Sequence, residues 1–205
     1  MPRKNFSVVR IVDDNPAFRE SEAFMLRMMG YNVAEYASAL EFLENDDPSV
    51  EGCVILDVKM PEMDGLQLQE VMTEQSIGLP IIFLTGHGNV EMAVNALHRG
   101  ASDFLQKPVE GEKLRASVER ALAENASRRE HDREIDDARA RFDRLTPREQ
   151  DVSRLVARGL LNKQIAAELG VTEHTVKVHR AAARFKLNAR TTADFADMLR
   201  LIGEF

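Results

Sequence analysis

Polar side chains that could do chemistry follow several short apolar runs in the first half of the sequence. They are the carboxylates of Asp13, Asp14 and Asp57, the hydroxyl of Thr85 and the amine of Lys107. Carboxylates gathered in one pocket repel one another by roughly 4 kcal/mol per pair at 4 Å, unless a cation lies among them. Oxygen ligands favour Mg²⁺, which keeps some of its waters and can bridge to a phosphoryl group. The set therefore predicts a magnesium-dependent phosphoryl site, with Lys107 and Thr85 stabilising the transferring oxygens.

Parallel strands would bring these side chains to one edge of a sheet. The apolar runs of this region are Val8–Val12, Asn32–Tyr36, Cys53–Asp57, Pro80–Thr85 and Asp103–Gln106. Near-continuous hydrophobicity in such short runs is typical of strands buried on both faces. Helical segments alternate with the runs, which predicts an α/β fold with a doubly wound, five-stranded parallel sheet. In the order 2-1-3-4-5, strands one and three flank the point where ligands bind, and they carry all three carboxylates.

Amphipathic segments between the runs predict helices on both faces of this sheet. Their expected bounds are Pro16–Met29, Ala39–Glu44, Leu66–Glu74 and Val90–Arg99. Ser38 and Glu41 have the spacing of a capping box, and Asn89 is the expected cap of the last helix. Three methionines of the first helix are expected to fill the core or an interface: Met25, Met28 and Met29.

The chain from residue 144 onward predicts an all-α domain of four short helices. Its first helix has a strong start signal, with Thr146 as the cap, followed by Pro147 and Glu149. Helices expected at Lys163–Leu169 and Glu173–Leu187 flank a short turn, which is the helix-turn-helix pattern. In that pattern the second helix enters the major groove of DNA.

The second of these two helices has a basic stripe and an apolar stripe. At about 100° per residue, Lys177, Arg180 and Arg184 lie within about 60° of one another. The apolar stripe, which should face the core, consists of Val176, Ala183 and Leu187. Insertion into a DNA groove needs such an arrangement, but many surface helices show it as well.

Charge is unevenly distributed along the chain. Residues 1–125 contain 11 Lys and Arg against 21 Asp and Glu, whereas residues 144–205 contain 11 against 7. A basic end on an acidic chain suggests an anionic partner, although an ordinary solvated surface can have the same balance. The segment between them is rich in both charges, with apolar anchors only at Ile135 and Phe142. This favours a charged linker helix over a two-chain coiled coil, which needs sustained apolar a and d positions.

Composition indicates a cytoplasmic protein with no membrane partner. A chain of 205 residues accommodates two small domains, and its longest apolar runs are too short to span a bilayer. The first residues lack the features of a signal peptide. The single cysteine, Cys53, cannot form an internal disulfide and is expected to be a buried thiol.

The motifs of the first half resemble the receiver domains of bacterial response regulators. The resemblance covers residues 7–122 and rests on four separated motifs, VDDN, ILDVKMPEMDG, FLTGHG and DFLQKP. It implies that Asp57 is the phospho-acceptor and that Asp13 and Asp14 hold Mg²⁺ together with it. The backbone carbonyl of Lys59 is implied as a further ligand.

The same resemblance assigns the remaining residues of the pocket. Thr85 and Phe104 stand where receivers have their switch pair, although Phe104 considered alone could be a plain core residue. Lys107 and Pro108 stand where receivers have their lysine and a proline that is usually cis. Val109 replaces the common aromatic residue that follows the proline.

The segment LTPREQDVSRLVARGLLNKQIAAELGVTEHTVKVHR resembles the LuxR/FixJ-type output domain. The resemblance implies phosphate contacts for Lys163 and Thr175, and base contacts for Lys177, Val178 and Arg180. It loosens after Arg180. There Arg184 replaces a residue that is often apolar and Phe185 one that is often charged, so which of Arg180 and Arg184 reaches DNA stays open. His179 is either a phosphate contact or a core histidine.

We interpret the chain as a FixJ/NarL-type regulator with a receiver domain (1–122), a helical linker (123–143) and a LuxR-type helix-turn-helix domain (144–205). A cognate sensor histidine kinase would phosphorylate Asp57, and the output domain would be freed or would form a homodimer that binds promoter DNA. As an activator it would also contact RNA polymerase. It would not be an enzyme beyond its own phosphorylation and autodephosphorylation at Asp57.

Two alternative functions would use some of the same residues. A phosphatase of the haloacid-dehalogenase type needs a second carboxylate two residues after the nucleophile, and Lys59 occupies that position. A regulator that binds DNA irrespective of phosphorylation would not need its pocket. The phosphoryl pocket is complete, however, which argues against this second hypothesis; it contains Asp13, Asp14, Asp57, Thr85 and Lys107.

Overall fold

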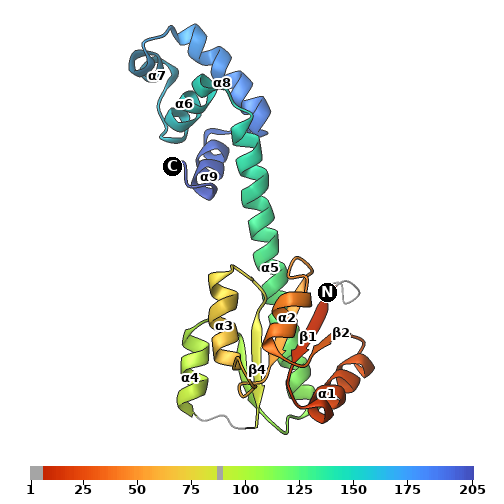
Figure 1. Ribbon diagram of the computed structural model, residues 1–205. Helices are drawn as coiled ribbons and strands as arrows, with labels where there is room; N and C mark the ends of the chain where they lie inside the picture. Colours follow the sequence, from red (N-terminus) through yellow and green to blue (C-terminus); the bar gives the residue numbers. More distant parts are fainter. Residues whose placement is uncertain (1–6, 87–89) are drawn as a thin grey trace. The chain divides into compact units, whose positions relative to one another are not determined.

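A computed structural model describes residues 7–86 and 90–205, and these form two compact units that divide between Arg129 and Glu130 (Figure 1). The elements of the first unit are β1 (Val8–Val12), α1 (Pro16–Met28), β2 (Asn32–Tyr36), α2 (Ala39–Asn45), β3 (Gly52–Leu56), α3 (Gly65–Glu74), β4 (Ile81–Thr85), α4 (Val90–His98) and β5 (Asp103–Gln106). Helix α5 (Gly111–Asp143) begins in the first unit and ends in the second. The expected cap Asn89, with His87 and Gly88 of the FLTGHG motif, lies outside the described residues.

The strands form one parallel sheet in the order β2-β1-β3-β4-β5, which confirms the predicted fold. The register pairs Val12 of β1 with Leu56 of β3. The residues that follow them, Asp13 and Asp57, therefore leave neighbouring strands at the same level. Thr85 is the last residue of β4, the next strand of the sheet.

Alternate strand residues point to opposite faces of the sheet and make two cores. One face packs against α1 and α5, with residues such as Leu26 and Val118. The other face packs against α2, α3 and α4, with residues such as Phe42 and Ala96. Cys53 of β3 is buried in the first of these cores, and burial raises the pKa of its thiol to about 12.

The helix and strand bounds of this unit agree with the expected ones to within one residue. Ser38 caps α2 by accepting a hydrogen bond from the backbone N–H of Glu41, as their spacing predicted. Met28, by contrast, is 74% exposed, so it does not fill the core. The buried stripe of α1 contains Ala23 and Leu26, and Met28 points away from both at about 100° per residue.

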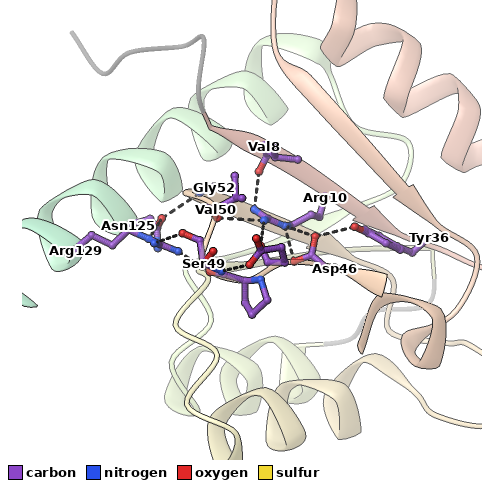
Figure 2. A network of polar contacts seen from close by, with 11 residues as sticks. Val8, Arg10, Tyr36, Asp46, Ser49, Val50, Gly52, Asn125 and Arg129 are labelled. Carbon is purple, nitrogen blue, oxygen red and sulfur yellow. Dashed lines mark hydrogen bonds and ion pairs between the residues drawn. The ribbon is translucent and has the colours of Figure 1, made fainter. Parts of the chain in front are cut away.

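A buried polar network joins β1 and β2 to the loop between α2 and β3 (Figure 2). Arg10 of β1 is 1% exposed, and its Nε donates to both carboxylate oxygens of Asp46 at 2.8 and 2.9 Å. The Tyr36 hydroxyl donates to the same carboxylate at 2.7 Å. Nη2 of Arg10 donates to the carbonyls of Asp47 and Val50 at 2.9 and 3.1 Å. Arg10 therefore fixes the α2–β3 loop through both its charge and its hydrogen bonds.

The same loop binds helix α5 (Figure 2). Arg129 donates to the carbonyls of Pro48 and Ser49 at 2.6 and 2.5 Å. Asn125 accepts from the backbone N–H of Gly52 at 3.1 Å. The first residues of the predicted linker, 123–129, thus pack as part of the first unit.

The second unit contains the end of α5 with α6 (Pro147–Ala157), α7 (Asn162–Leu169), α8 (Glu173–Leu187) and α9 (Thr192–Leu201), which confirms the predicted helical domain. Thr146 and Thr172 cap α6 and α8 with their side chains, and Asn188, in the left-handed region at φ 55°, ends α8. Of the two expected anchors at the end of α5, Phe142 is buried in the core of this unit, whereas Ile135 is half-buried. None of the helices in the described ranges combines the length and apolar character of a bilayer span.

Candidate phosphoryl pocket and DNA-binding face

Three carboxylates meet at the carboxyl edge of the sheet, where the strand ends were expected to place them. Asp13, Asp14 and Asp57 each offer an oxygen, and these oxygens lie within 4.8 Å of one another. Asp13 and Asp57 are buried, whereas Asp14 is exposed. An oxygen-only donor set at an edge that water can reach is the kind of site Mg²⁺ prefers, so the residues fit the expected cation.

The amine of Lys107 lies among these carboxylates. Its Nζ forms an ion pair with Asp13 and lies 3.5 Å from Oδ1 of Asp57. Burial lowers the pKa of Lys107, but the hydrogen bond and the charge of Asp13, followed by the charge of Asp57, raise it by more. Lys107 is therefore a fixed positive charge for an incoming phosphoryl oxygen. Its peptide bond to Pro108 is cis, as the resemblance implied.

Asp57 has contacts with several groups of the pocket. The backbone N–H of Lys59 donates to its Oδ2 at 3.2 Å, and the side chain of Thr85 forms a hydrogen bond with it. Burial and the charge of Asp13 raise the pKa of Asp57 by more than Lys107 and Thr85 lower it. The side chain of Lys59 is exposed, which leaves its backbone as the part of the residue next to the carboxylate.

The expected switch residues lie on neighbouring strands. Thr85 ends β4, is fully buried and reaches Asp57. Phe104 of β5 is half-buried, and its ring centroid lies 5.9 Å from that of Phe83 on β4. The structure therefore brings Thr85 to the pocket and places Phe104 against the core beside it.

A fourth carboxyl group near the pocket was not expected from the sequence. Glu22 of α1 is buried, and its Oε2 has no hydrogen-bond partner in the described part of the chain. The pKa of Glu22 is raised to about 7, mainly by burial; the charge of Lys107 opposes the rise, and the charges of Asp13 and Asp57 add to it. The sequence feature that could have indicated its burial is its place in the apolar stripe of the first helix, next to Ala23.

The residues expected to contact DNA are Lys163 of α7 and Thr175, Lys177, Val178, Arg180 and Arg184 of α8. Lys163, Lys177 and Arg184 are exposed, and Val178 is 54% exposed. The buried residues of α8 are Val176, Ala183 and Leu187, which confirms the predicted apolar stripe. The helix thus presents its basic stripe away from the core.

Three residues of α8 are more enclosed than this exposed group. The Thr175 hydroxyl lies 2.9 Å from the hydroxyl of Thr172 at the helix start. Arg180 is half-buried, and its guanidinium donates to the side chains of Asn162 and Thr192. His179 is half-buried, so neither of its two expected roles is excluded.

Comparisons with known proteins agree with both halves of this geometry. Residues 9–119 match the response regulator receiver domain, and residues 143–199 match the LuxR family of bacterial regulatory proteins. Nodulation protein W of Bradyrhizobium diazoefficiens is 41% identical over 96% of this chain and 87% of its own length. The transcriptional regulatory protein FixJ of Azorhizobium caulinodans is 35% identical over 95% of this chain and 92% of its own.

A solved structure is similar over nearly the whole chain. The response regulator StyR is 43% identical, with a TM-score of 0.85 over 95% of this chain and 98% of its own. The two family matches, the relatives and this structure agree with the parallel sheet and with the helix-turn-helix. The chain therefore belongs to the two-component response regulators that join a receiver domain to a LuxR-type DNA-binding domain.

Proposed function

We propose that this regulator binds promoter DNA under the control of phosphorylation at Asp57, with a cognate sensor histidine kinase as the phosphoryl donor. The observation that carries the proposal is the convergence of three carboxylates with Lys107 and Thr85 at one edge of the sheet. Perturbed pKa values cluster at functional sites, and the pKa values of Asp57 and Lys107 are both raised here.

The chemistry assigned to these residues is a phosphoryl transfer. An oxygen of Asp57 forms a bond to phosphorus while the bond between phosphorus and the kinase histidine breaks, and the histidine keeps the electron pair. Asp13, Asp14, Asp57 and the carbonyl of Lys59 would hold Mg²⁺, which supplies positive charge for the phosphoryl oxygens. Lys107 leaves its ion pair with Asp57 and contacts one of those oxygens, and Thr85 donates to another.

The signal would pass from Thr85 and Phe104 to the second unit, and phosphorylation would favour a homodimer on promoter DNA. We assign residues 1–122 to the receiver, 123–143 to a linker whose first residues, 123–129, pack on the receiver, and 144–205 to the DNA-binding domain. The chain's own chemistry would be confined to gain and loss of the phosphoryl group at Asp57. Contact with RNA polymerase would follow if the regulator activates transcription.

Phosphorylation is expected to raise the affinity for DNA by roughly 5-fold to 150-fold, the usual range of coupling between two sites. The full-length protein is treated with Mg²⁺ and acetyl phosphate, and binding to a promoter fragment is measured by fluorescence anisotropy, with mass from sedimentation equilibrium. A dimer and tighter binding should appear together. Equal affinities at complete modification would instead support the alternative, a regulator that binds DNA irrespective of phosphorylation.

A fragment that lacks residues 1–129 distinguishes relief of inhibition by the receiver from dimerisation. If the receiver inhibits, the fragment binds DNA more tightly than the unphosphorylated full-length protein. If dimerisation controls binding, the fragment binds more weakly.

Lys163 and Lys177 are expected to have different roles on DNA. Lys163→Ala should weaken binding to all sequences equally, because it removes a phosphate contact. It should also reduce the slope of log affinity against log salt concentration by about one unit per half-site. Lys177→Ala should cost about 1–3 kcal/mol on the cognate site and relax preference at one or two base positions. Both variants are measured on cognate and scrambled duplexes across a salt series. If Lys177→Ala weakens the two duplexes equally, the lysine contacts only phosphate.

A further inference from the structure

The second unit contains a basic cavity beside the C-terminal half of α8. Its volume is about 540 Å³, and α8, its end and the loop before α9 supply most of its lining. Four lining residues are cations: Lys177, Arg180, Arg184 and Arg190. Among the described residues that line the cavity, none carries a carboxylate. Like charges gathered around one hollow favour an anion inside it.

In the described part of the chain these cations form no ion pair, unlike several others of the same unit. Lys186 pairs with Glu149 at 2.6 Å, and Arg154 pairs with Glu204 at 2.8 Å. Within the ranges that the structure describes, no ion pair involves any of the four cavity cations. Several cations of this unit are therefore neutralised by its own carboxylates, whereas the charge around the cavity stays available for an external partner.

Asp194 is a carboxylate close enough to Arg190 for the two charges to interact, but it has other hydrogen-bond partners. Asp194 feels the charge of Arg190, but its oxygens accept from the backbone N–H groups of Arg190 and Thr191 at 2.6 and 3.0 Å. The Thr191 hydroxyl also donates to Asp194 at 2.7 Å, and this bond together with the two backbone bonds caps the start of α9 and lowers the pKa of Asp194. Its charge is thus committed to the helix end.

Two of the guanidinium groups are held in place by neutral partners. Arg180 donates to Oδ1 of Asn162 and to Oγ1 of Thr192, each at 3.0 Å. Nε of Arg184 donates to the carbonyl of Ala189 at 3.2 Å. Neutral acceptors fix the orientation of a guanidinium without cancelling its charge, and its other N–H groups stay available for an oxyanion.

The position of the cavity on α8 indicates which anion it would take. Lys177 and Arg184 are seven residues apart, which is about 10 Å along the helix. Base contacts in helix-turn-helix proteins come mainly from the N-terminal part of the recognition helix, while contacts elsewhere go to the phosphate backbone. The helix dipole also favours cations in the last turn of a helix, which would account for Arg184. It does not account for Arg190, which lies beyond the helix end.

We propose that this cavity is a phosphate site, in which Arg184 and Arg190 bind a backbone phosphodiester of the DNA while Arg180 shapes the wall. The inference rests on the proposed DNA-binding function and adds Arg190 to the interface. It also gives Arg180 and Arg184 roles in positioning the helix rather than in reading bases. The contribution of these two residues to affinity should therefore depend on their charge and not on the base sequence of the DNA.

The test compares charge-neutral variants in the full-length, acetyl-phosphate-treated protein. Arg190→Gln should reduce the slope of log affinity against log salt by about one unit per bound domain, with an unchanged ratio between cognate and scrambled duplexes. Arg184→Gln should do the same. Arg148→Gln is the matched control, because it removes the same charge from an exposed site on α6 outside the cavity and should leave the slope unchanged.

The outcomes separate this inference from the proposed function. Normal binding by the wild type, with Arg190→Gln and Arg184→Gln behaving like Arg148→Gln, would overturn the phosphate site alone. A wild type with no salt-dependent DNA binding would overturn both. Arg184→Gln also loses the bond to Ala189, so a thermal melt accompanies it. Arg190→Gln breaks no side-chain bond of the described structure, and its result decides the question if the other variant unfolds.

Discussion

Asp57→Asn is expected to reduce phosphorylation of the protein by acetyl phosphate to background. Asp57 is the pocket carboxylate that combines a hydrogen bond from Thr85 with Lys107 Nζ at 3.5 Å. Asparagine keeps the shape of the side chain but lacks the nucleophilic carboxylate oxygen. Intact-mass spectrometry, followed by peptide mapping of the adduct, measures the modification with Mg²⁺ and again after chelation, which should also prevent it.

Asp64→Asn provides the matched control for this experiment. Asp64 lies in the loop after the phospho-acceptor and caps α3, a role that asparagine can also fill. The control protein should therefore fold and become modified at the wild-type level. Stable modification of Asp57→Asn at the level of this control would show that the phospho-acceptor is another residue.

Arg10→Met is expected to lower the free energy of unfolding of the first unit by about 3–5 kcal/mol, because it leaves the buried charge of Asp46 without its partner. The two side chains are 1% and 6% exposed. Both tyrosines of the chain, Tyr31 and Tyr36, belong to the first unit, and the chain has no tryptophan. Tyrosine fluorescence during urea unfolding therefore reports on that unit.

Two further variants test the cause of this loss. Tyr36→Phe removes only one hydrogen bond to Asp46 and should cost about 0.5–1.5 kcal/mol. Arg10→Met combined with Asp46→Leu removes both charges and should recover much of the stability that Arg10→Met alone loses. If the single Arg10→Met change costs less than Tyr36→Phe, the ion pair does not hold the α2–β3 loop.

The sheet and its carboxyl edge were predictable because their signals are local. Short apolar runs fix the strands, and the polar residue after each run lies at the edge by topology. The Arg10–Asp46 pair was not predictable, because 36 residues separate its members and an arginine within an apolar strand gives no indication of its partner. Glu22 was missed for a similar reason, since its burial depends on α1 packing on the sheet.

The helical end shows the same division between local and distant signals. The cap at Thr146 depends on neighbouring residues and was predicted from them. The contacts of Arg180 come from α7 and α9, which the sequence of α8 does not specify. Of the two places expected for Met28, the core is wrong, because its position on the helix exposes it, and the interface stays a prediction.

The reactivity of the buried Cys53 thiol reports on how often the first unit unfolds. The chain has one cysteine, on a strand with neighbours on both sides, and its pKa of about 12 leaves almost no reactive thiolate at neutral pH. A thiol reagent reaches Cys53 when the sheet opens, so the rate of labelling measures how often this opening occurs. The second unit contributes no signal, and any ligand that binds only the closed first unit must slow the reaction in proportion to its occupancy.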